Sequence, residues 1–121
     1  MNKKITLILI IILIAVAGFI YLIYPRQGND NQSSQLDVFA QCLAGKGATM
    51  YGAYWCSHCQ NEKKAFGNSF QFVPYVECTQ EPKKCLAAGI EGYPTWIFGD
   101  GRRFEGEQGL QRLSIESGCP L

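Results

Sequence analysis

The sequence predicts an α/β domain of four helices and four strands, preceded by one membrane-spanning helix. Three observations carry this prediction. Residues 5–24 form an uncharged apolar run. After residue 35, helical and strand patterns alternate and are separated by Gly and Pro turns. Cys56 and Cys59, with two residues between them, stand where a strand gives way to a helix.

Composition limits the classes of protein that this chain can represent. Its 121 residues are 47% apolar, and the formal net charge is +1. Without the apolar N-terminus, one small domain with a single core remains. The near-neutral charge and the lack of a basic cluster argue against nucleic-acid binding. Six cysteines indicate disulfides if the domain is exported. In a cytosolic protein, metal binding or redox chemistry would be the favoured interpretation of the same cysteines.

The apolar run at residues 5–24 would span roughly 30 Å as a helix, about the thickness of a bilayer's hydrocarbon core. Lys3 and Lys4 precede it, so residues 1–4 are expected in the cytoplasm and Pro25 onward outside. The alternative is a cleaved signal peptide, with small residues at positions 15–17. Apolar residues continue to Tyr24, which favours a retained single-pass anchor in the cell membrane.

Residues 25–35 are predicted to be a flexible linker, because the segment after Pro25 is polar throughout. The domain proper is expected at residues 36–121. Its first helix covers residues 36–44, with Leu36, Phe39 and Leu43 at helical spacing and Asp37 in the first turn.

The aromatic segment at residues 49–55 predicts a strand, and residues 57–66 predict a helix that Gly67 ends. Phe66 and Phe70 are expected to pack against the sheet. A second strand is predicted at residues 72–77, where Pro74 indicates an edge or an initial position.

The C-terminal third continues this alternation. A helix is predicted from Pro82 to Ala88, followed by a strand at residues 95–98. The turn at residues 99–101 leads to a fourth strand at residues 102–105. The last helix covers residues 109–117, with its buried side at Leu110, Leu113 and Ile115.

Cys56 is expected at a helix N-terminus, where unpaired N–H groups and the helix dipole favour a thiolate. Cys59 lies one turn further on, close enough for a disulfide. His58, when protonated, adds positive potential beside the Cys56 sulfur, which must be exposed to attack. Two other interpretations remain open, a buried structural disulfide and a metal site formed by Cys56, His58 and Cys59.

These motifs support a resemblance to a known family. Residues 55–59, Trp-Cys-Ser-His-Cys, followed by Gly-Tyr-Pro-Thr at 92–95, resemble a thioredoxin-fold active site with its cis-proline loop. Segments 50–56, 59–60, 74–78 and 92–96 are together similar to the thioredoxin-like domain that accompanies bacterial vitamin K epoxide reductase homologues. The resemblance implies a thioredoxin-like fold, with a central four-stranded mixed sheet flanked by helices.

The resemblance also implies roles for individual residues. Cys56 would be the attacking sulfur and Cys59 the resolving one. A cis bond before Pro94 would place the backbone of Tyr93 opposite these sulfurs, where it could pair with an extended substrate. Substrate contacts are expected from Trp55, Ser57, Tyr93 and Thr95.

The implied activity is thiol–disulfide exchange without a cofactor or metal. A histidine at position 58 is similar to that of periplasmic disulfide-introducing oxidases and protein disulfide isomerases, which favours an oxidase over a reductase. Ser57 departs from the Pro often found before that histidine. Reduced exported proteins would be substrates, and a separate quinone-linked, vitamin K epoxide reductase-like membrane protein would reoxidise the chain, which has one hydrophobic span.

The outer cysteines are expected to form structural disulfides. Cys78 and Cys85 would join a strand end to the next helix, and Cys42 and Cys119 the first helix to the C-terminus. Other pairings remain open, as does an electron-shuttling role for one pair.

One family feature is absent, since the strand before Cys56 has no carboxylate to accept the proton of Cys59. Water, Glu62 and Glu77 are candidate replacements. The alternative function is a non-catalytic, disulfide-stapled binding module of the same fold.

Overall fold

The computed structural model describes residues 2–24 and 30–121, in two units that divide at Asp30. The first unit contains helix α1 (Lys3–Ile23), none of whose side chains is buried. Its mean hydropathy reaches 3.0, so it is long and apolar enough to cross a membrane, and a signal sequence has the same properties. Residues 25–29 of the expected linker lie outside the described residues.

The second unit is built on four short strands, β1 (Thr49–Gly52), β2 (Tyr75–Glu77), β3 (Thr95–Ile97) and β4 (Arg103–Glu105). Their order in the sheet is β2-β1-β3-β4. β1 is parallel to β2 and antiparallel to β3, and β3 is antiparallel to β4. β2 is therefore an edge strand, in agreement with the position of Pro74 just before it.

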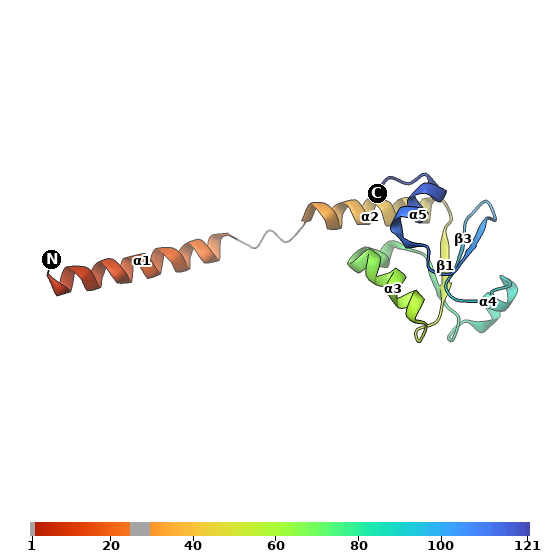
Figure 1. The fold of residues 1–121 in the computed structure, drawn as a ribbon, viewed down its shortest axis with the longest axis horizontal. Helices are drawn as coiled ribbons and strands as arrows, with labels where there is room; N and C mark the ends of the chain where they lie inside the picture. The colour runs from red at the N-terminus through yellow and green to blue at the C-terminus, as the bar shows by residue number, and fades with distance from the viewer. Residues whose placement is uncertain (1, 25–29) are drawn as a thin grey trace. The chain divides into compact units, whose positions relative to one another are not determined.

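Four helices and a short 3₁₀ helix complete this unit: α2 (Asp30–Gly45), α3 (Ser57–Phe66), η1 (Gly67–Phe72), α4 (Pro82–Ala87) and α5 (Gly109–Ser117). α3 and α4 lie on opposite sides of the strands (Figure 1). Gly67 ends α3 with a positive φ of 56°, which a glycine adopts without strain. The mixed sheet and its flanking helices form the predicted thioredoxin-like fold.

The core of this unit is aromatic and lies where α2 and α3 meet the sheet. Phe39 of α2 stacks on Phe66 of α3 with a ring-centroid distance of 5.8 Å. Phe66 also contacts Trp96 of β3 at 6.2 Å and Phe70 of η1 at 5.9 Å. Phe66 is therefore fully buried, as expected, whereas Phe70 packs at the edge of this core.

Helix α2 begins six residues earlier than predicted, so residues 30–35 of the expected linker are helical. Polarity alone suggested a flexible segment, but tertiary contacts hold this part of the helix. The Ser69 hydroxyl of η1 donates to Asp37 Oδ1 at 2.6 Å and lies 3.5 Å from the Ser33 carbonyl oxygen. Asp37 consequently lies within the helix rather than in its first turn.

The strands are shorter than predicted, for identifiable reasons. β1 ends at Gly52 because the next residues turn, with the Cys56 N–H donating to the Ala53 carbonyl at 3.1 Å. β2 begins only at Tyr75 because η1 occupies the chain up to Phe72. In α5 Leu113 is buried, whereas Ile115 is 74% exposed, so its expected burial is wrong.

Two disulfides join elements of this unit, one across a long stretch of the chain and one across a short loop. Cys42 of α2 is bonded to Cys119 near the C-terminus, across 77 residues. Cys78, just after β2, is bonded to Cys85 of α4 across seven residues. These are the two pairings that the sequence favoured, and they leave Cys56 and Cys59 as the two thiols.

Candidate active site

Cys56 is the N-cap of α3, directly after the turn that follows β1. Its backbone is extended, and its Sγ accepts a hydrogen bond from the Cys59 N–H at 3.2 Å. A sulfur at this position satisfies one of the N–H groups that a helix start leaves unpaired, and the helix dipole favours negative charge there. The local geometry therefore suits a thiolate at Cys56.

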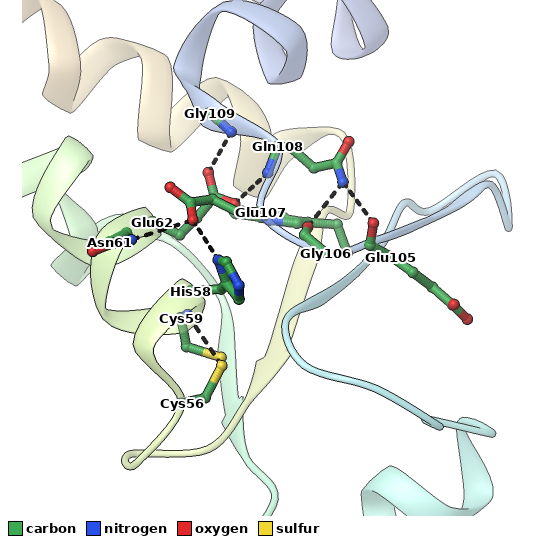
Figure 2. A network of polar contacts seen from close by, with 11 residues as sticks. Cys56, His58, Cys59, Asn61, Glu62, Glu105, Gly106, Glu107, Gln108 and Gly109 are labelled. Carbon is green, nitrogen blue, oxygen red and sulfur yellow. Dashed lines mark hydrogen bonds and ion pairs between the residues drawn. The ribbon is translucent and has the colours of Figure 1, made fainter.

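Cys59 lies in the first turn of α3, and Figure 2 shows its sulfur next to that of Cys56. Burial raises the pKa of the Cys59 thiol to about 12, and the hydrogen bond and charge of Cys56 add to the rise. A hydrogen bond from the Ala53 backbone and the charge of Lys63 act in the opposite direction. Cys59 is thus a protonated thiol at neutral pH.

The expectation that the Cys56 sulfur is well exposed is wrong for this structure. Cys56 is 7% exposed and Cys59 is 0% exposed. Cys56 is buried because its side chain turns back over the first turn of α3 to meet the Cys59 N–H. Of the two residues, Cys56 is the one that keeps some exposed surface.

His58 is exposed, and its ring is directed toward the turn before α5 (Figure 2). Its Nδ1 lies 2.9 Å from Glu107 Oε2, which also accepts a hydrogen bond from Asn61 Nδ2 at 3.4 Å. The hydrogen bond from His58 lowers the pKa of the Glu107 carboxyl, with a smaller contribution from Asn61. An ionised Glu107 can only accept, so His58 Nδ1 carries the proton of this bond.

Glu62 lies further along the same helix and is fully buried. It accepts hydrogen bonds from the Gln108 N–H at 2.7 Å and the Gly109 N–H at 2.8 Å (Figure 2). Trp96 Nε1 donates to it at 3.4 Å. Because Gln108 and Gly109 open α5, Glu62 caps that helix from α3 and so fixes the cysteine-bearing helix to its neighbour.

The other expected site residues lie in the loop before β3 and around the start of α3. The Tyr93–Pro94 peptide bond is cis. Trp55, 61% exposed, makes an edge-to-face contact with Tyr93 at a centroid distance of 5.8 Å. Ser57 is exposed at the start of α3. Trp55 and Ser57 are therefore exposed, and Tyr93 is partly exposed.

Thr95 does not match its expected role in substrate contact. It is fully buried, and its hydroxyl donates to the Gly92 carbonyl oxygen at 2.8 Å. The side chain therefore stabilises the loop that carries Pro94, and this burial argues against contact with a substrate through the hydroxyl.

Three functional candidates have no local signal in the sequence. Glu107 lies 49 residues from His58, and Gly109 lies 47 residues from Glu62. Tyr75 lies beside Cys59 only because β2 pairs with β1. The sequence around β2, with a proline followed by an aromatic residue, is typical of a strand that packs in a core. No spacing rule could therefore have identified these contacts.

Within residues 2–24 and 30–121, no three His, Cys, Asp or Glu side chains converge to form a metal site. His58 instead pairs with Glu107, on the side of α3 that faces the 105–109 turn.

Comparison with known proteins gives two relevant similarities, although no protein-family model matches the chain. A protein of Arabidopsis thaliana named "Thiol-disulfide oxidoreductase LTO1" is 39% identical over 115 residues, 87% of this chain and 30% of that protein. The "Thioredoxin domain-containing protein 5 homolog" of Drosophila melanogaster is 32% identical over 89 residues, 64% of this chain and 21% of that protein.

The chain thus spans less than a third of the length of each of these relatives. The similarities support a thioredoxin-like family, in agreement with the fold.

Proposed function

We propose that this chain is a thiol–disulfide oxidoreductase that reacts through Cys56 and Cys59. One observation carries the proposal: Cys56 caps α3 with its sulfur on a backbone N–H, and the buried thiol of Cys59 lies one turn away. Substrate thiolate attacks Cys56 Sγ of the disulfide, and Cys59 leaves with the electron pair of the broken bond. A second substrate thiolate then attacks the substrate sulfur and releases Cys56 as a thiolate.

The preferred direction in this proposal is oxidation of the substrate. A helix start that stabilises the Cys56 thiolate stabilises the reduced form, and this makes the disulfide more oxidising. We expect a reduction potential nearer to about −120 mV, the value of a strong disulfide-introducing oxidase, than to about −270 mV, the value of thioredoxin. Equilibration of the pair with glutathione or dithiothreitol measures this potential.

The proposal places the domain outside the cell membrane, held by α1 as a single-pass anchor. Lys3 and Lys4 at its N-terminal end support this orientation. Reduced exported proteins would be substrates, and a quinone-linked membrane protein similar to vitamin K epoxide reductase would reoxidise Cys56 and Cys59. N-terminal sequencing of the mature chain distinguishes an anchor from a cleaved signal sequence, because cleavage at the small residues 15–17 would remove most of the apolar segment.

The central experiment is oxidative refolding of a reduced, unfolded protein with the full chain in detergent. Cys56→Ser should abolish dithiol oxidation, because Cys59 alone can form no Cys56–Cys59 disulfide to pass to a substrate. The double variant Cys78→Ser with Cys85→Ser is the control and should retain the activity, since that bond is structural. Full activity of Cys56→Ser, or its loss only in the control, would refute the assignment.

A further inference from the structure

The proton of Cys59 must move in each round of exchange, yet this sulfur has no exposed surface. In the oxidising direction the leaving Cys59 sulfur takes up a proton, and in the reverse direction the Cys59 thiol loses one before it attacks Cys56. The preceding strand β1, with the sequence Thr-Met-Tyr-Gly, offers no carboxylate. Another group must therefore exchange this proton.

Glu62 is the nearest candidate on α3 but is already committed. Its two carboxylate oxygens accept from the Gln108 and Gly109 N–H groups, with Trp96 Nε1 as a third donor. Protonation would remove the negative charge that strengthens these three buried hydrogen bonds and would weaken them. The role of Glu62 as the cap of α5 therefore conflicts with a role in proton transfer.

Tyr75 of β2 lies against Cys59 across Gly52. A Cβ atom placed on Gly52 would lie 3.0 Å from Cys59 Sγ and 3.2 Å from the Tyr75 hydroxyl oxygen. The sulfur and the phenol thus face one another across the space that a side chain at position 52 would fill. A water placed in this space would bridge the two groups.

The Tyr75 phenol leads directly to a carboxylate. Its hydroxyl donates to Glu77 Oε2 at 2.7 Å. Tyr75 and Glu77 are two residues apart on β2 and so lie on one face of the sheet, and Glu77 is paired in register with Gly52. Glu77 is only partly buried, which gives the far end of this chain of groups access to solvent.

The protonation states suit a relay. Burial, followed by the hydrogen bond to Glu77, raises the pKa of Tyr75, so the phenol stays protonated. Burial alone would raise the pKa of Glu77, but hydrogen bonds from Tyr75, Thr79 and the Tyr54 N–H outweigh it and lower the pKa. An ionised carboxylate therefore stands ready to accept the phenol's proton.

The other charged groups around this path come from α3. Lys63 Nζ lies 3.7 Å from the centroid of the Tyr75 ring, and its charge lowers the pKa of Cys59. Cys56 acts in the opposite sense on both Cys59 and Tyr75. A cation at Lys63 favours the anionic states that form along the path.

We propose that Tyr75 and Glu77 form the proton path of Cys59. The proposal rests on the oxidoreductase function proposed above. In the resolving direction the Cys59 proton passes to the Tyr75 hydroxyl oxygen, and the phenol's own proton passes to Glu77 and then to water. The Cys59 thiolate attacks Cys56 Sγ of the mixed disulfide and the substrate thiolate leaves. In the oxidising direction the same protons move back as Cys59 leaves Cys56.

The test is the rate at which oxidised glutathione oxidises the reduced full chain in detergent, followed by tryptophan fluorescence between pH 5.5 and 9.5. At low concentrations of oxidised glutathione, the second-order rate constant reports the attack by Cys56. At high concentrations the observed rate constant reaches a plateau, and this plateau reports resolution of the mixed disulfide by Cys59. Tyr75→Phe and Glu77→Gln should each lower the plateau at neutral pH by at least about tenfold, because a positioned proton acceptor typically contributes that much or more. Both substitutions should also shift the pH dependence of the plateau rate toward higher pH. The second-order rate constant should stay within twofold of the wild-type value.

Matched controls are Tyr51→Phe on the neighbouring strand and the exposed Glu91→Gln, both of which should keep the wild-type plateau. The double variant Tyr75→Phe with Glu77→Gln distinguishes a proton relay from a general loss of structure at the site. In a relay its plateau should equal that of the slower single variant, whereas independent structural effects would multiply. A multiplied effect, or a plateau within twofold of wild type in both single variants, would overturn the path.

The two proposals fail in distinguishable ways. If the wild-type chain forms no mixed disulfide with glutathione, the oxidoreductase function itself is refuted. If the mixed disulfide forms normally and the single variants resolve it at the wild-type rate across the pH range, only the proton path is refuted.

Discussion

Replacement of Glu62 by Gln tests whether this buried side chain is a structural cap of α5. The change keeps the volume but converts one acceptor oxygen into an NH₂ group that faces the Gln108 or Gly109 N–H. One buried donor then loses its partner, which costs about 1.5–3 kcal/mol for a hydrogen bond to a charged group. Loss of negative charge at the start of α5 adds roughly 0.3–1 kcal/mol.

The expected loss of unfolding free energy is therefore about 2–4 kcal/mol. For a domain of this size each kcal/mol lowers the Tm by roughly 4–8 °C, so a decrease of about 8–32 °C is expected. Thermal unfolding of the oxidised full chain in detergent, followed by circular dichroism, measures it. Glu91→Gln is the matched control and should change the unfolding free energy by less than about 0.5 kcal/mol.

A Glu62→Gln variant as stable as the control would refute the capping argument. The same variant also bears on the chemistry of Cys59. If its stability were unchanged but its resolving step slowed, Glu62 and not Tyr75 would be the proton acceptor.

Two further predictions concern the disulfides and the ion pair at His58. Replacing Cys42 and Cys119 together by Ala should cost about 4 kcal/mol of unfolding free energy, whereas replacing Cys78 and Cys85 should cost about 2.5 kcal/mol, because the longer loop loses more chain entropy. Chemical denaturation compares the two, and an equal or reversed cost would contradict the loop-length argument. His58→Ala should raise the pKa of Glu107 toward that of an ordinary carboxyl, because His58 supplies the main hydrogen bond that lowers it. The ion pair of His58 and Glu107 stabilises the folded state at pH values above the ordinary carboxyl pKa. This stabilisation is lost as the pH falls through the lowered pKa of Glu107. Carboxyl-carbon NMR titration of Glu107 measures the change, with Glu116→Gln as a control, and an unmoved midpoint would show that His58 is not the cause.

Local sequence signals were sufficient for the elements whose ends are set by neighbouring residues. The bounds of α3 and α5 agree with the prediction, because Gly67 ends the first and glycines stand at both ends of the second. The placement of Cys56 at the start of α3 also follows from local signals. Pro74 left an edge or an initial position open for β2, and the structure shows both, since β2 is an edge strand that begins directly after Pro74.

Contacts between distant segments explain where the sequence was insufficient. The start of α2 depends on Ser69, more than 30 residues away, so a polar segment that reads as a linker is helical. Burial of Cys56 depends on how its side chain turns over α3, which no pattern encodes. The closeness of Tyr75 to Cys59 requires both the parallel register of β1 with β2 and the missing side chain at Gly52.

The bond between Cys42 and Cys119 has a mechanical consequence. All four strands, α3, α4 and α5 lie between these two positions in the chain. If tension were applied across residues 31 and 121, it would run along α2, cross the sulfur–sulfur link and leave through the last two residues. The sheet and the reactive cysteines would carry none of it, so a pull on this domain could stretch α2 and leave the redox centre intact.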